Sequence, residues 1–115
     1  MSMLLESSGT VKFAVVNASS SGNNTVIAAA TGKKFRVLSY VVVSADAVTA
    51  QLSSGASPTA LSGAMSLAAN GGVSANFNPA GHVETAEGEA LVLVLGGAIQ
   101  VSGHVTYQEI IVTPS

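Results

Sequence analysis

The chain has 115 residues, which is enough for one domain that buries roughly two-thirds of its unfolded surface without the help of metals or disulfides. Only 9% of the residues are charged and only four are basic, too few to neutralise a run of phosphates, so nucleic-acid binding is not expected. The lack of cysteine excludes a disulfide scaffold and thiolate metal sites.

The N-terminal residues 1–9 are predicted to form a short arm. They end in Ser-Ser-Gly, and such an arm becomes ordered only when something holds Leu4 and Leu5. The start of the chain lacks the pattern of a signal peptide, and Arg36 and Asp46 interrupt the longest apolar region, so no membrane span is expected. We therefore expect one domain over 10–115, in a protein made in the cytoplasm.

The strand predicted over 35–44 is the central one. A Gly-Lys-Lys turn leads into a run of β-branched and aromatic residues, as a long core strand requires. Alternation places the odd-numbered residues from Phe35 to Val43 on one face and the even-numbered residues, including Val42, on the other. Because neither face is polar, we expect both to be covered over part of the length.

The next segment, 47–53, alternates as a half-buried strand does, and Ala45 and Asp46 are predicted to make the tight reversal of a hairpin that places it beside the central strand. Further strands are predicted over 10–17, 25–30, 61–69, 73–78, 90–95 and 104–113. Turn signals separate them, and no segment has a convincing helical pattern. The sequence predicts an all-β fold, an antiparallel β-sandwich or jelly roll of about eight or nine short strands.

Two apolar runs, 41–43 and 91–95, are hydrophobic on both faces of their strands. Runs of this kind promote aggregation when a face or an edge stays open, so natural proteins cover them. The chain is also short of solvating charge, with 48% hydrophobic residues. We therefore expect an oligomer in which Val42, Val92 and Val94 contact a neighbouring subunit.

Residues that could carry chemistry are few. No Gly-x-Ser-x-Gly elbow occurs, the only aspartate is Asp46 in a predicted turn, and the Gly-Lys-Lys turn lacks the spacing of a phosphate-binding loop. His82 and Glu84 are two possible metal ligands on one strand face, but further ligands are lacking, and His104 is most simply a hydrogen-bonded residue at a strand start. No catalytic residue, metal or cofactor is expected, and we predict that the protein is not an enzyme.

Several stretches together resemble a group of small virion proteins of tailed phages, of the head-decoration or cement type: 16–25, 31–44, 61–72, 88–91 and 103–107. The likeness lies in turns and strand texture and covers nearly the whole chain. It implies a β-sandwich or jelly-roll subunit, a homotrimer that clamps adjacent copies of the major capsid protein near three-fold axes, and a place on the capsid exterior. Fibre and tail-tip proteins of phages share this texture.

The resemblance suggests two kinds of contact with the capsid. Lys33, Lys34 and Arg36 would meet an acidic capsid surface, and Leu4 and Leu5 would order on binding the shell or a neighbouring subunit. The alternative is a tail-fibre domain that binds a host receptor or glycan through the polar loop 17–25. Such sites stack sugars on exposed aromatic rings, whereas all five aromatic residues here lie in strand patterns.

Overall fold

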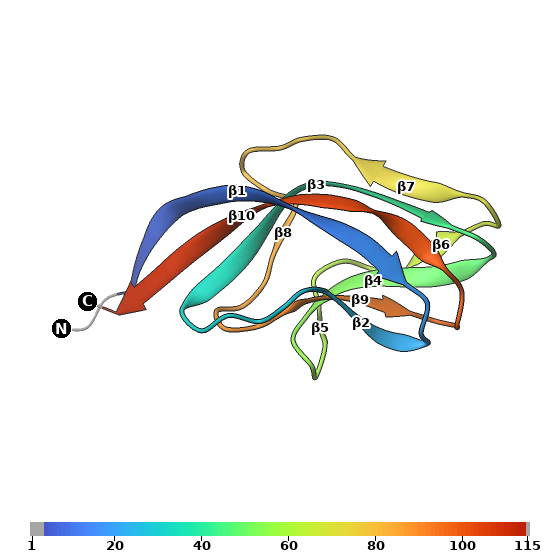
Figure 1. The fold of residues 1–115 in the computed structure, drawn as a ribbon, viewed down its shortest axis with the longest axis horizontal. Coiled ribbons are helices and arrows are strands. Elements are labelled where there is room, and N and C mark those ends of the chain that lie inside the picture. Colours follow the sequence, from blue (N-terminus) through green and yellow to red (C-terminus); the bar gives the residue numbers. More distant parts are fainter. Residues whose placement is uncertain (1–3, 115) are drawn as a thin grey trace.

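The computed structural model describes residues 4–114, with side chains described from 9 to 112. Two antiparallel five-stranded sheets pack together, and no helix occurs among the described residues (Figure 1). Strands account for 61% of the chain. The predicted all-β sandwich is confirmed, and no helix that could span a membrane is present in the described part of the chain.

The longest strands all belong to one of the two sheets, sheet A. Sheet A has the order β1 (Leu4–Ala18), β10 (Val101–Pro114), β3 (Lys33–Ser44) and β7 (Gly72–Ala75), and β8 (Val83–Glu84) also pairs with β3. Sheet B has the order β2 (Gly22–Ile27), β9 (Leu91–Leu95), β4 (Val48–Ser54) and β5 (Thr59–Ala60), and β6 (Met65–Leu67) also pairs with β4. The three long strands lie side by side in sheet A, with β1 at its edge.

The first strand begins earlier than predicted. Residues 4–7, predicted as part of an arm, pair with 111–114 of β10, so both ends of the described chain lie at the same tip of the molecule (Figure 1). A bulge between Ser7 and Thr10 separates this ribbon from the rest of β1. The arm prediction was wrong for the backbone of 4–9 because pairing with a distant strand decides where an edge strand ends. The side chains of Leu4 and Leu5 lie outside the described ones.

The core lies between the sheets. Sheet B contributes Leu91, Leu93 and Leu95, whose side chains are at most 2% exposed, because alternation points these three residues of β9 inward. Sheet A contributes Phe35 and Tyr107, whose rings meet edge to face with centroids 5.6 Å apart. The chain has few aromatic residues, so its core depends on close packing of these leucine side chains and the one aromatic pair.

A bulge at Leu38 changes the faces of the central strand. Thr106 of β10 lies opposite Ser39 and Tyr107 lies opposite Val37, so Leu38 is an extra residue in β3. Before the bulge Phe35 and Val37 point into the core, and after it Val42 does. The single alternation predicted for the whole strand was therefore wrong beyond Leu38.

The predicted hairpin after the central strand does not form. β3 belongs to sheet A and β4 to sheet B, so residues 45–47 carry the chain from one sheet to the other. The Ala45 N–H donates to the carbonyl oxygen of Gln100 at 2.9 Å, which holds this crossing against the segment before β10. The prediction was wrong because a short link can join two strands of a hairpin or carry the chain from one sheet to the other. Both edges of β3 are also already paired, one with β10 and the other with β7.

Candidate functional site

The outer face of sheet A, turned away from sheet B, carries the exposed apolar side chains of the long strands. On β1 the exposed fractions are 48% for Val11, 79% for Phe13 and 75% for Val15, and on β3 Val43 is 46% exposed. These residues share one face because odd positions of β1 alternate with the core residues Val16 and Ala18. We call this surface the bare face.

Cross-strand rows make the bare face continuous. One row runs from Val15 through His104 to Val41, and the next runs from Phe13 through Thr106 to Ser39. The only titratable side chain in these two rows is His104, which is exposed. A sheet face with valines and a phenylalanine in neighbouring rows is the kind of surface that proteins use for binding other proteins.

The outer face of sheet B is covered by its own chain. Asn23 and Gln51 both lie opposite Val94 on this face, and their amide groups donate at 2.9 Å to the carbonyl oxygens of Ala56 and Ser62. These bonds tie Ala56 and Ser62 to this face, while β5 between them pairs with β4 in the plane of the sheet. Val92 is only 2% exposed within one copy, and Val94 is half-buried.

The predicted subunit contacts therefore need correction. Val42 is 2% exposed and belongs to the core because the bulge at Leu38 turns it inward. Val92 is covered from outside within one copy, and Val94 is half-covered, so these side chains present little surface to a second copy. Phe13 and Val15 were not predicted as contacts, and they are exposed because no described segment covers the outer face of sheet A at β1.

The four basic residues of the chain all bind glutamates. Lys12 Nζ and Lys33 Nζ lie 3.0 and 3.1 Å from the two carboxylate oxygens of Glu109. Hydrogen bonds from both lysines lower the pKa of Glu109 below its ordinary value of 4.5, against a smaller opposing effect of burial. This cluster has a net charge of +1.

The second cluster lies on the outward side of β3 and β8. Glu84 sits opposite Arg36 across the strand pair and accepts hydrogen bonds from Arg36 Nε at 2.9 Å and Nη2 at 2.8 Å, and Lys34 Nζ lies 3.1 Å from its other oxygen. Burial alone would raise the pKa of Glu84, but the two cations together lower it below 4.5. Lys33, Lys34 and Arg36, predicted as a basic capsid contact, are thus ion-paired within the chain, and two glutamates neutralise half of the charge of the four basic residues.

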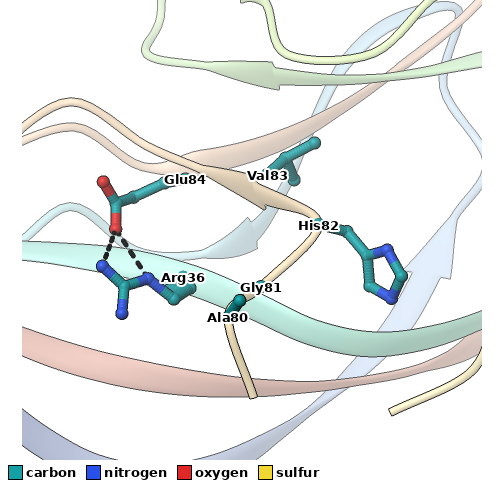
Figure 2. Close-up of a pocket in the computed structure, with 6 residues that line it drawn as sticks. All are labelled: Arg36, Ala80, Gly81, His82, Val83 and Glu84. Atoms are coloured by element: carbon teal, nitrogen blue, oxygen red, sulfur yellow. Dashed lines mark hydrogen bonds and ion pairs between the residues drawn. The ribbon is translucent and has the colours of Figure 1, made fainter. Parts of the chain in front are cut away.

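A hollow of about 310 Å³ lies beside this second cluster, lined by Arg36 and residues 80–84 (Figure 2). Arg36 and Glu84 form one side and the His82 imidazole points to the other. His82 Nε2 is 2.7 Å from the carbonyl oxygen of Asn76, and its ring meets the ring of Tyr40 edge to face. Both possible metal ligands, His82 and Glu84, therefore have structural partners.

No group of three or more His, Cys, Asp or Glu residues that could hold a metal ion occurs among the described residues. Asp46 is exposed, and its carboxylate accepts a hydrogen bond from the neighbouring Ala47 N–H at 2.8 Å.

Two aromatic side chains differ from expectation. Phe13 is 79% and Phe77 is 63% exposed, whereas their strand patterns had suggested that all aromatic rings were unavailable. Phe77 lies beyond the end of β7, in the loop that leads to the hollow. The signal missed was position: an edge strand and a loop leave large side chains uncovered.

Comparison of the chain with models of known protein families, with curated proteins and with solved structures found no match in any of the three.

Proposed function

We propose that this protein is a structural subunit of a tailed-phage virion, which binds the capsid exterior and stabilises the shell. The observation that carries the proposal is the bare face: Val11, Phe13, Val15 and Val43 expose apolar surface on one side of a rigid sandwich. The resemblance of the sequence to head-decoration proteins supports the capsid as the larger partner.

The stabilising effect would come from binding. A protein that binds the assembled shell and not its dissociated subunits shifts the disassembly equilibrium toward the shell by mass action. Attachment as an oligomer multiplies weak contacts, since each further contact forms within an already bound particle. The trimeric state is implied by the resemblance alone, and the major capsid protein is the proposed partner for the same reason.

Ion-pair geometry changes the proposed mode of contact. Glu84 and Glu109 neutralise half of the charge of the four basic residues. We therefore propose that an apolar contact through the bare face is the main source of affinity for the capsid. Lys33, Lys34 and Arg36 would then orient the protein on the capsid surface. Leu4 and Leu5 remain candidates at the tip of the ribbon formed by β1 and β10.

The test is the heat stability of capsids that lack the protein, measured with and without saturating amounts of it. We expect a higher melting temperature of the decorated heads. Phe13→Lys should reduce binding to the heads, while Phe77→Lys, at an exposed phenylalanine outside the bare face, should bind as the unchanged protein does. Equal melting temperatures at full occupancy would contradict the cementing role.

A second candidate function is glycan binding by a tail-fibre domain, and one observation favours it. Phe77 is 63% exposed in the loop leading to the hollow, and exposed rings are the surfaces on which sugars stack. A glycan array with the purified protein tests this candidate. Binding that is lost in Phe77→Ala and retained in Phe13→Ala would favour the fibre role over the capsid role.

A further inference from the structure

The outer edge of β1 is open along its length. Among the described strands β1 pairs with β10 alone, so every second residue of β1 presents its N–H and C=O groups away from the sheet. Proteins protect such edges with prolines, bulges, short strands or charges. The segment 10–18 has no proline, one charged residue and no bulge.

That one charged residue is already paired within the chain. Lys12 lies opposite Tyr107, whose side chain is in the core, so Lys12 is on the opposite face of β1 from the bare face. Its Nζ is bound to the Glu109 carboxylate at 3.0 Å. The open edge therefore adjoins the three most apolar exposed positions of β1, and the one charged residue between them lies on the other face and is paired with Glu109.

The sequence of this edge is complementary to itself. If two copies of β1 run antiparallel about a two-fold axis with Phe13 opposite Phe13 of the second copy, Val11 lies opposite Val15 at both ends of the row. Shifting the pairing by two residues in either direction places a valine opposite Asn17 or Gly9. One register alone thus joins all three apolar residues with one another.

We propose that a second copy of this chain binds at β1, with the two β1 strands antiparallel in the register centred on Phe13. The contact joins two A sheets into one continuous sheet and brings the apolar rows of both copies together on one side. Each copy uses the same residues, as a two-fold interface requires. Lys12 lies opposite Ala14 of the second copy and keeps its own Glu109.

The first test is the mass of the purified protein in solution. Sedimentation over a dilution series should give a species of about twice the 11.3 kDa of one chain. Phe13→Lys should give the monomer, since the register places the two introduced charges opposite each other, and Phe77→Lys should remain a dimer. A wild-type monomer, or a trimer that Phe13→Lys leaves intact, would overturn the proposal.

Single cysteines test the register because the natural chain has none. Residues directly opposite in an antiparallel pair have Cα atoms about 4.5 to 5.5 Å apart, within the range that a disulfide bridges. Phe13→Cys should form a disulfide-linked dimer on mild oxidation. Val11→Cys alone should not, because the two copies of residue 11 would be about 13 Å apart along the strands, whereas a mixture of Val11→Cys and Val15→Cys should cross-link.

Phe77→Cys controls for random collisions, because its exposure is similar to that of Phe13. Cross-linking of Phe13→Cys no faster than that of Phe77→Cys would overturn the pairing. These experiments use the purified protein alone, so they can fail or succeed independently of the capsid role. A confirmed two-fold pair would replace the trimer that the resemblance implies.

Discussion

The outer faces of the two sheets carry similar apolar strands but have opposite surroundings. On sheet B, Val92 is 2% exposed within a single copy, and on sheet A, Val15 is 75% exposed because nothing in the described chain lies over β1. The difference teaches that alternation in a sequence tells which residues share a face, while loops decide which face is buried.

The bare face is confined and does not reflect poor folding. The chain exposes 5877 Å², close to the roughly 5,700 Å² expected of a compact monomer of its mass. A single copy is therefore about as compact as other small proteins of its mass. Four of the six large apolar side chains exposed in the described chain lie on β1 and β3, and the other two are Phe77 and Ile111.

The largest expected effect on the free energy of unfolding comes from comparing two variants, each of which places a lysine on the outer face of one sheet. Val92→Lys should lower the free energy of unfolding by about 3 kcal/mol or more, because the ammonium group would be buried without a partner. Val15→Lys should change it by less than about 0.5 kcal/mol in the monomer, since the side chain extends into water. Urea unfolding of both variants measures the difference. Equal losses of unfolding free energy would contradict the conclusion that the outer face of sheet B is covered and that of sheet A is bare.

The second prediction concerns the part of sheet A beside the hollow, where residues 80–84 lie against β3. Gly81 has φ +87°, and a Cβ there would overlap the Cγ of Arg36. Gly81→Ala should lower the free energy of unfolding by about 2 to 3 kcal/mol, from backbone strain and from displacement of Arg36. Gly88→Ala, at φ +77° with open space around its Cβ, isolates the backbone contribution and should cost about 1 kcal/mol. Similar losses in thermal unfolding would show that the contact with Arg36 is unimportant.

A smaller change in the free energy of unfolding tests whether water reaches the buried Ser53 on the outer face of sheet B. Ser53 is fully buried, and its hydroxyl oxygen has no hydrogen-bond partner. Ser53→Ala should therefore raise the free energy of unfolding by about 1 kcal/mol. Ser44→Ala is the matched control, because the equally buried Ser44 hydroxyl donates to the Ala68 carbonyl at 2.9 Å, and its loss should cost about 1 kcal/mol. Destabilisation by Ser53→Ala would indicate that water reaches this hydroxyl.

The smallest effect is expected from pH. The lysines that bind Glu109 lower its folded pKa below 4.5, so this ion pair stabilises the fold fully above pH 4.5 and is lost as the pH falls through the lowered folded value. Glu109→Gln should remove part of that acid dependence, by about 1 kcal/mol or less, since the lysines are well exposed. Glu87→Gln, at an exposed glutamate, is the control in urea unfolding across this pH range. An unchanged acid dependence in Glu109→Gln would contradict the role of the cluster.

Much of the fold could be predicted because strand identity depends on local pattern. The alternation around Phe35 and the apolar run 91–95 predicted core strands, and both supply core residues. Pairing could not be predicted in the same way, since the link at 45–47 allows either a hairpin or a crossing to the other sheet. The bulge at Leu38 was equally invisible, because one inserted residue reverses the faces without changing the composition of the strand.

The candidate site was less predictable than the fold. Lys33, Lys34 and Arg36 look like a free basic turn in the sequence, yet their glutamates lie 48 to 76 residues away along the chain and approach only through sheet pairing. Phe13 and Val15 look like core residues until the packing of the two sheets shows that they lie on the uncovered face of β1, while Val16 and Ala18 of the same strand lie in the core. Both properties depend on contacts between distant segments, which one sequence does not reveal.

The pairing of the first strand with the last has a consequence for synthesis of the protein. Leu4 lies opposite Pro114, and β1 has no partner within the described chain other than β10. On the ribosome β1 must therefore wait unpaired until nearly all of these residues have been made. Contacts so far apart in sequence make folding slow and leave strands open to association while they wait, so nascent chains of this protein should depend on chaperones until β10 has emerged.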